Sequence, residues 1–397
     1  MGVAPWAAAL LLVGGASSHD QTLTESRFVE TCLTNHPAIA AAEASVGAAS
    51  GARRQAGVLA NPELAWEREE AEATARQTTW SMSWRLPFDG RGHRLEAADE
   101  AIAAAQSAAD ASRLETRRET QELFAAWYIA SEREAVIKDH LDHASRLETW
   151  LRDRAQQGEA AGVEARRLTL EVEVLSRQLA AARAEALAHR AAAATWSELV
   201  TPGIRPGRPG LAPPPDSVEV GGSPGLEALA HRVAESEARH ELSKHVLEPP
   251  EISVGWTEIR DGTQSFDGPV FALAWPVPLF DRNRGNRAVA AAEADRSRQE
   301  LREASSRAAQ RADAALASYS TLYRAASSGG TAASDGIVEP IWAAFEAGEM
   351  GLTDLLDALR TSAEVRLSRL ETLADSLAAE RELEAAIGRP LTPGGRP

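Results

Sequence analysis

The stretch Trp80-Ser81-Met82-Ser83-Trp84-Arg85-Leu86 alternates strictly between large apolar side chains and small or polar ones. A period of two residues is typical of a β-strand with one apolar face and one polar face. The alternation recurs in the segments 252–257 and 271–277, and a shorter version of it surrounds Trp66. We therefore predict four short strands, at about residues 62–70, 78–87, 250–259 and 268–278.

The two halves of the chain carry the same landmarks in the same order. Each half has a proline at a helix start, a proline before a strand, a phenylalanine after the strands and a glycine between two helices. The pairs are Pro37 and Pro224, Pro62 and Pro250, Phe88 and Phe280, and Gly158 and Gly348. Their offsets lie between 187 and 192 residues. A period this long indicates a duplicated half rather than a solenoid, whose repeats run to roughly 20–50 residues.

Very long helices are predicted to follow each pair of strands. From Leu123 to Leu151, and again after Gly158 and after Gly348, apolar side chains recur at alternating steps of four and three residues. Sustained heptads are typical of coiled-coil seams. Both glycines lie between two helices with this heptad pattern, an outgoing one and a returning one. We therefore expect the tip of an antiparallel helical hairpin near each glycine. An outgoing helix over 91–154 would reach roughly 95 Å at 1.5 Å per residue.

The segments outside the repeats have their own composition. An apolar run at 6–13 followed by small residues, with Ala16 and Ser18 at the −3 and −1 positions, resembles a signal peptide. The doublet Gly329-Gly330 interrupts the second outgoing helix, as a kink or a short insertion. The expected division is a signal peptide at 1–18, a first repeat at 22–200, a Pro/Gly linker at 201–224, a second repeat at 225–389 and a flexible tail at 390–397.

Composition excludes several classes of function. The formal net charge is −16 with no basic stripe, so we expect no nucleic-acid partner, because phosphate neutralisation supplies most of that affinity. After the first residues, no run of about 18 uncharged apolar residues predicts a transmembrane helix. The sequence holds no phosphate-binding loop, nucleophile motif or zinc-protease motif, so we expect neither an enzyme nor a cofactor.

Four amphipathic strands cannot form a stable sheet by themselves. In water they would expose tryptophan, and in lipid their open edges would leave backbone groups unpaired, so only a closed barrel is stable there. The small membrane barrels use eight strands, so the four strands of this chain would have to form a barrel together with strands from further copies of the chain. The alternative from the residues is a soluble α+β protein whose hairpins pack on its own helices, which leaves helices of this length unexplained.

Three segments carry a resemblance to a known family. They are Trp275-Pro276-Val277-Pro278-Leu279-Phe280-Asp281-Arg282-Asn283-Arg284-Gly285-Asn286, Phe345-Glu346-Ala347-Gly348-Glu349 and Leu352-Thr353-Asp354-Leu355-Leu356-Asp357-Ala358-Leu359-Arg360. Over about residues 22–389 the chain resembles TolC-like outer-membrane efflux proteins, nearest their heavy-metal branch of cobalt–zinc–cadmium type. The resemblance implies a mainly α fold with a small β part. It also implies a homotrimer, whose twelve strands form an outer-membrane barrel above a periplasmic α-barrel of coiled-coil helices.

The resemblance also implies a function and partners. We expect a passive outer-membrane exit duct for divalent heavy-metal cations, served by a periplasmic adaptor (membrane fusion) protein and an inner-membrane pump of the RND type. Two alternatives stay open: an exit duct for drugs or other small organic molecules, and a secreted coiled-coil scaffold without a pore.

Particular residues are expected at three places in such a duct. Carboxylates near the second tip would ring the periplasmic entrance and favour cations; these are Asp354 and Asp357, with Glu164 as the nearest acidic counterpart in the first half. The tips that dock the adaptor would contain Gly158, Glu159, Gly348 and Glu349. The aromatic side chains that face outer-membrane lipid would be Trp66, Trp80, Trp84, Trp256 and Trp275.

The strongest metal-like pattern is Asp139-His140 with Asp142-His143. Residues three apart share a helix face, so His140 and His143 are weak candidates for a metal site. The alternative is a solvated flank beside the core residue Leu141. We assign no role to His36, His189, His231 and His245, which are isolated in the sequence.

Overall fold

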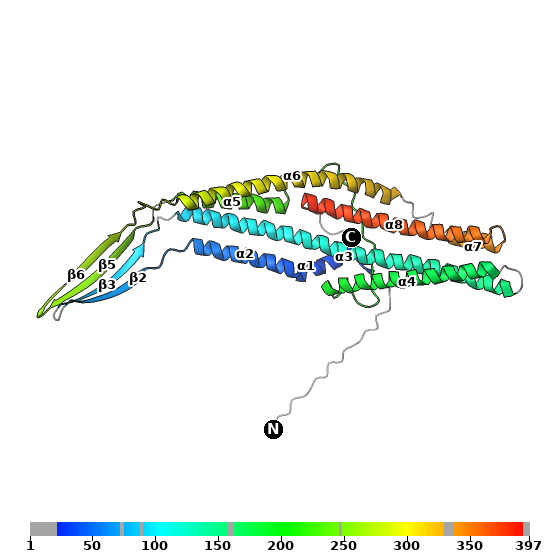
Figure 1. The fold of residues 1–397 in the computed structure, drawn as a ribbon, viewed down its shortest axis with the longest axis horizontal. Helices are drawn as coiled ribbons and strands as arrows, with labels where there is room; N and C mark the ends of the chain where they lie inside the picture. The colour runs from blue at the N-terminus through cyan, green and yellow to red at the C-terminus, as the bar shows by residue number, and fades with distance from the viewer. Residues whose placement is uncertain are drawn as a thin grey trace, which may run out of the picture.

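The computed structural model describes residues 22–71, 75–87, 90–156, 162–245, 248–328 and 337–391. The expected signal peptide and several predicted positions (Phe88, Gly158, Glu159 and the Gly329-Gly330 doublet) lie outside these ranges. The molecule is a long rod with a β-sheet at one end and helical hairpin ends at the other (Figure 1).

The sheet has four antiparallel strands in the order β2-β3-β5-β6. Its strands are β2 (Glu63–Ala71), β3 (Ala75–Arg85), β5 (Glu251–Asp261) and β6 (Gln264–Ala274). The hairpins of the two halves meet at the centre, where Trp80 pairs with Trp256. Within the chain, β2 and β6 each pair on one side only, so the sheet is open at both edges.

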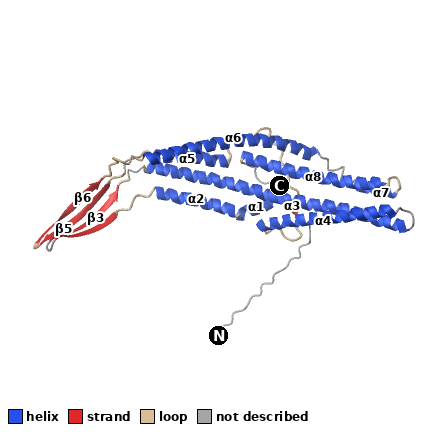
Figure 2. Ribbon diagram, in the orientation of Figure 1, coloured by secondary structure: helices blue, strands red, loops and turns tan. Residues whose placement is uncertain are grey.

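Helices make up the rest of the rod (Figure 2). They are α1 (Glu25–Asn35), α2 (Pro37–Ala56), α3 (Arg91–Gln156), α4 (Gly162–Trp196), α5 (Pro224–Ser243), α6 (Arg284–Ser328), α7 (Val338–Glu346) and α8 (Leu352–Ile387). A short parallel pair joins β1 (Thr22–Leu23) to β4 (Arg205–Pro206) within the segment that links the two halves. Among the described residues, no helix is both long and apolar enough to span a membrane.

The duplication is visible in the order of the elements. In each half a helix of 20 residues leads into a strand hairpin, then a long outgoing helix, then a returning helix. Both leading helices begin with proline at the first position, where a missing N–H costs nothing. The side chains of His36 and Ser223 accept hydrogen bonds from the free backbone N–H groups at these two starts.

Helix α3 is the spine of the rod, because it packs against α2, α4, α5 and α8. Its 66 residues correspond to roughly 100 Å of helix. On α4, the residues Leu168, Leu175 and Ala182 are buried at steps of seven, as the heptad pattern predicts. Most of the other α4 side chains are exposed, including the apolar Leu170 and Val174. In the single chain this helix therefore has an apolar face without a partner.

Candidate functional site

The sheet places most of its large apolar side chains on one face. Strand pairing aligns Trp66 with Trp80 and Trp80 with Trp256, so three tryptophans form one row across three strands. The rings of Trp66 and Trp80 lie 6.1 Å apart. The exposed apolar residues that share this face are Leu64, Trp66, Trp80, Met82, Ile252, Val254, Trp256, Phe271 and Leu273.

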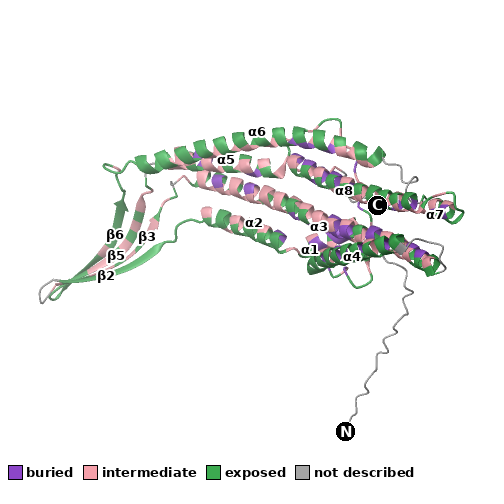
Figure 3. Cartoon of the chain, turned by 45° about the vertical axis from the view of Figure 1, so that its right-hand side comes forward, coloured by how far each residue is buried: buried purple, intermediate pink, exposed green. Residues whose placement is uncertain are grey.

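The opposite face of the sheet carries mainly small and polar side chains, and its apolar exceptions are Ile259, Phe266 and Val270. Ser81 pairs with Gly255 there, and the hydroxyl oxygens of Thr79 and Thr257 lie 3.0 Å apart in a hydrogen bond. None of the described strand residues in this sheet is buried, and Figure 3 shows the buried positions confined to the helical part of the rod. Because the described part of the chain leaves the tryptophan face uncovered, this face needs another apolar environment to pack against.

The five predicted membrane tryptophans differ in their surroundings. Trp66, Trp80 and Trp256 are exposed on the strands, whereas Trp84 donates its Nε1–H to the Ala60 carbonyl over 3.0 Å. Trp275 lies one residue beyond β6, which ends at Ala274. Pro276 follows it and cannot donate a backbone hydrogen bond that would extend the ladder.

The turn between α7 and α8 is built around Gly348. This residue has a φ of +78°, in the left-handed region. Its N–H donates to the Phe345 carbonyl, and the N–H of Glu349 donates to the Ala344 carbonyl. This pair of bonds is the Schellman arrangement that ends many helices. A Cβ added to Gly348 would meet no atom within 4 Å, so the turn constrains the backbone while its outer surface stays open.

The predicted entrance carboxylates lie at this end of the rod. Asp354 and Asp357 are exposed one turn apart at the start of α8, on either side of the buried Leu355. Glu164 is exposed in the first turn of α4. The structure thus brings Asp354 and Asp357 together on one helix and places Glu164 on another helix that also begins near a tip.

One ion pair ties the two helical hairpins together behind these carboxylates. Arg360 on α8 donates to Glu171 on α4 over 2.8 Å. The hydrogen bond and charge of Glu171 raise the pKa of Arg360, and the nearby Asp357 adds to that effect. Since both partners are partly exposed, the pair contributes little to stability, and it links α8 to α4 across the two hairpins.

The tip also has an apolar core that joins the hairpins. Leu147 from α3, Leu168 from α4, Trp342 from α7 and Leu355 from α8 belong to one buried cluster. The guanidinium of Arg146 lies 4.5 Å from the centre of the Trp342 ring, within the range of a cation–π contact. The two hairpins therefore form one packed unit at this end.

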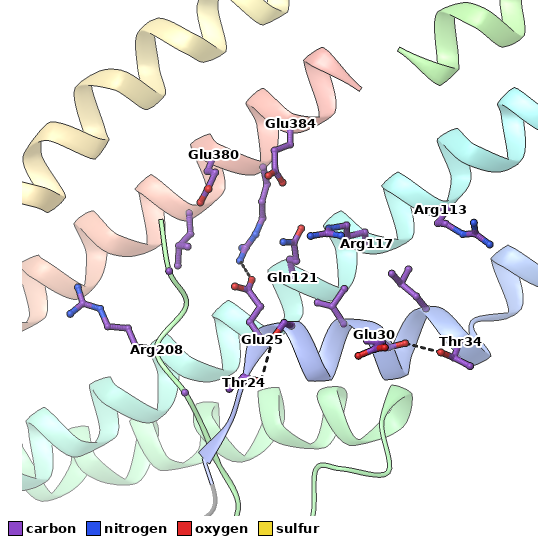
Figure 4. Close-up of a pocket in the computed structure, with 17 residues that line it drawn as sticks. Thr24, Glu25, Glu30, Thr34, Arg113, Arg117, Gln121, Arg208, Glu380 and Glu384 are labelled. Carbon is purple, nitrogen blue, oxygen red and sulfur yellow. Dashed lines mark hydrogen bonds and ion pairs between the residues drawn. The ribbon is translucent and has the colours of Figure 1, made fainter. Parts of the chain in front are cut away.

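At the middle of the rod, a pocket of ≈ 630 Å³ lies between α1, α3, α8 and the linker. Arg381 and Glu25 form a largely buried ion pair in its wall, 3.0 Å apart, and Figure 4 shows Glu25 with this contact as a dashed line. Hydrogen bonds hold the linker next to this ion pair. The Ala212 N–H donates to Glu380 over 2.9 Å, and the Tyr319 hydroxyl donates to the Ala212 carbonyl. The sequence analysis did not single out these residues, because partners that lie more than 100 residues apart leave no local pattern.

The predicted histidine pair does not form a closed metal site. His143 Nε2 lies 3.5 Å from Asp139 Oδ1, and Asp139 also binds Arg366 of α8. Burial is the main cause that lowers the pKa of His140. In the ranges that the structure covers, no group of three or more His, Cys, Asp or Glu side chains is arranged to hold a metal ion.

Two histidines that look isolated in the sequence have close neighbours in the fold. His231 Nδ1 lies 2.8 Å from Glu100 Oε2, across the contact between α5 and α3. The His245 ring centre lies 5.5 Å from that of His93. Each pair is separated by more than 130 residues in the chain, so only the packing of α5 on α3 reveals them.

Comparisons with known proteins place the fold. No family model matches the chain. The cobalt-zinc-cadmium resistance protein CzcC of Cupriavidus metallidurans is 27% identical over 371 residues, which cover 88% of this chain and 86% of that protein. The CmeC outer membrane channel of Campylobacter jejuni has a TM-score of 0.72 at 13% identity, covering 92% of this chain and 85% of CmeC. The transmembrane channel protein CusC has a TM-score of 0.72 at 15% identity, covering 95% of both chains.

These comparisons confirm the resemblance that the sequence motifs carry. The chain is similar in sequence to a heavy-metal resistance protein and has the fold of outer-membrane channels. The predicted mainly α fold, with long helices and a small open sheet, is confirmed as well.

Proposed function

We propose that this chain is the outer-membrane exit duct of a tripartite efflux system, in which three copies conduct substrate passively from the periplasm to the exterior. The observation that carries the proposal is the open four-stranded sheet, with exposed tryptophans on one face and unpaired edges on both sides. The sheet lies in the outer membrane, and the helical rod extends into the periplasm.

Closure of the sheet requires more than one chain. In lipid every backbone N–H and C=O must be paired, so open strand edges are not stable. Three copies would supply twelve strands, above the eight of the smallest membrane barrels. The apolar Leu170 and Val174, exposed on α4, offer the helices of a neighbouring copy a surface to pack on. The fold that the chain shares with the channels CmeC and CusC supports a role as a channel.

The proposed substrates are divalent heavy-metal cations. The similarity to CzcC supports this class, and the net charge of −16 is compatible with it. Because the chain holds no nucleotide-binding motif, the energy comes from an inner-membrane pump of the RND type through a periplasmic adaptor. Asp354 and Asp357 of three copies would place like charges around the entrance, which favours cations over anions.

Conductance of the purified protein in planar lipid bilayers tests the duct and its entrance together. We expect a cation-selective pore that a large trivalent cation blocks from the periplasmic side. Asp354→Asn with Asp357→Asn should weaken both the selectivity and the block, because the entrance charge is lost. Glu364→Gln with Glu371→Gln, which removes the same charge farther along α8, is the matched control and should change neither.

Two results would contradict this account. A protein that gives no conductance steps is not a duct. Unchanged selectivity and block in the Asp354→Asn, Asp357→Asn variant, together with a modest loss of thermal stability, would show that these carboxylates only offset the dipole at the start of α8. The substrate class is tested separately: a deletion strain should lose tolerance to cobalt, zinc and cadmium, and keep its tolerance to organic drugs.

A further inference from the structure

The sheet end of the rod gathers histidines from two distant parts of the chain. His93 lies in the first turn of α3, directly after the β2-β3 hairpin, and His245 lies just after α5, directly before β5. Figure 1 shows the start of α3 and the end of α5 near the sheet, and these two helices pack together. We propose that His93 and His245 form a docking site for a divalent transition-metal cation at this junction. The proposal deepens the proposed function, since such a cation is the proposed substrate.

The distance between the two rings fits one shared ion. Their centres lie 5.5 Å apart, with ring planes inclined by 40°. Two imidazoles bound to one tetrahedral zinc ion through Zn–N bonds of about 2.0–2.1 Å have ring centres about 5 Å apart. A small rotation of either side chain therefore brings one nitrogen of each ring to a common ion.

The backbone at Gly90 allows this approach. Gly90 has a φ of +70°, and a Cβ there would lie 3.2 Å from His245 Cδ2 and 2.7 Å from Leu242 Cδ1. Only a residue without a side chain lets the end of α5 pack so closely on the start of α3. The same close packing holds His245 beside His93.

A carboxylate orients one of the two rings. His93 Nδ1 lies 3.2 Å from Glu96 Oε2, one helical turn away. Metal-binding histidines commonly use their second nitrogen in this way, because a carboxylate partner fixes the ring and raises its basicity. The Glu96 contact thus leaves Nε2 of His93 as the nitrogen available to a cation.

The neighbouring pocket supplies a negative electrostatic environment. Its volume is ≈ 460 Å³, and its charged lining consists of four glutamates and one arginine, Arg298. Glu237 and Asp295 hold that guanidinium, and Glu241 holds the adjacent Lys244 ammonium. The glutamates of the lining are Glu96, Glu100, Glu237 and Glu241. Arg298 and Lys244, two basic side chains at this surface, are therefore already paired with carboxylates when a divalent cation approaches.

His240 also lines this pocket. Its Nδ1 is buried and has no hydrogen-bond partner among the described residues. Lys244 is the main cause that lowers the pKa of Glu241, and His240 and His93 add to it, so both imidazoles lie within reach of that carboxylate's charge. His240, whose Nδ1 has no partner among the described residues, is thus a candidate for a further ligand once an ion is bound.

A site with two imidazoles and water in the remaining positions suits a duct. Conduction requires binding that is favourable enough for entry and weak enough for release. Since no closed group of three ligands exists within the described residues, bound ions would exchange rapidly.

Calorimetric titration of the purified, detergent-solubilised protein with ZnCl₂ tests the site. We expect about one Zn²⁺ per chain, and binding that His93→Gln with His245→Gln abolishes. Glu96→Gln should weaken it by about tenfold, the lower end of the usual range for an outer carboxylate partner. His140→Gln with His143→Gln, a histidine pair elsewhere on α3, is the matched control and should bind as the wild type does. With Cu²⁺ as the probe, paramagnetic resonance of the wild type should show coupling to two ring nitrogens, independently of any variant.

The proposal is overturned by equal Zn²⁺ binding in the wild type and the His93→Gln, His245→Gln variant, by loss of binding in the control pair, or by no binding at all. Conductance measured on the same preparations separates the two proposals. If the wild type conducts ions but does not bind Zn²⁺, the proposed duct stands and the proposed histidine site is rejected. If the wild type binds Zn²⁺ at these histidines but does not conduct ions, the histidine site stands and the proposed duct is rejected.

Discussion

At the scale of single residues, Gly348 has two possible roles: it lets the chain turn between α7 and α8, and it lets an adaptor dock at the tip. Substitutions of this residue separate the two roles. Its φ of +78° costs an ordinary side chain about 1–2 kcal/mol, whereas asparagine tolerates this region. We expect Gly348→Ala to lower the unfolding free energy by about 1 kcal/mol and Gly348→Asn to lower it less. Thermal unfolding in detergent measures both.

The same pair of variants tests adaptor docking at the second tip. Because the surface outside Gly348 is open, an asparagine side chain projects there without disturbing the fold. We expect Gly348→Asn to assemble normally and to fail in metal efflux. Full efflux by this variant would show that the glycine serves only to turn the chain.

His140 gives a pH dependence with a definite sign. Burial holds its pKa in the folded protein below the ordinary value of 6.5, so the unfolded chain binds the proton more readily. Its contribution to stability is therefore complete above pH 6.5 and is lost as the pH falls through the folded-state pKa. Each unit of difference between the two pKa values corresponds to about 1.4 kcal/mol.

We expect His140→Gln to lose less thermal stability than the wild type between pH 7.5 and pH 5.5. Melting temperatures of both proteins across this range provide the measurement. An equal or steeper loss in the variant would show that His140 is as accessible to protons in the folded protein as in the unfolded chain.

At the scale of elements, the two faces of the sheet should respond differently to charge. Leu273 lies on the tryptophan face of β6, and its neighbour Ala272 lies on the small-residue face. Leu273→Arg should cost on the order of 2–4 kcal/mol at mid-membrane depth and block assembly, whereas Ala272→Arg should assemble. Size-exclusion chromatography in detergent distinguishes the two. Normal assembly of Leu273→Arg would mean that this face does not contact lipid.

The elements also show how far sequence patterns reach. Period-two alternation predicted the two faces of the sheet over the segments 80–86, 252–257 and 271–277, because each pleat exposes successive side chains on opposite sides. It did not predict that Ile259, Phe266 and Val270 lie on the otherwise polar face. It predicted the ends of the strands less well. Because Asp267 and Gly268 resemble a turn, β6 was predicted to begin near residue 268, whereas in the structure it begins at Gln264. In the structure the turn lies at Gly262, with a φ of +57°, and the ladder continues through Asp267.

At the scale of the whole molecule, the repeat and the heptads predicted a duplicated rod, because both are periodic along the chain. The contacts between the halves are not periodic and could not be predicted. His93 meets His245, Glu25 meets Arg381, and Tyr319 meets Ala212 only because α3, α5, α8 and the linker pack side by side. Asp354 and Asp357 are proposed as entrance residues through a family resemblance, since an exposed acidic pair carries no signal of its own.

Native mass spectrometry of the protein in detergent tests the central claim, that the sheet is completed by copies of the same chain. The account predicts a trimer that withstands mild collisional activation and requires detergent, because three open sheets close into one barrel with a tryptophan-rich outer face. A stable monomer that stays soluble when the detergent is removed would contradict the account.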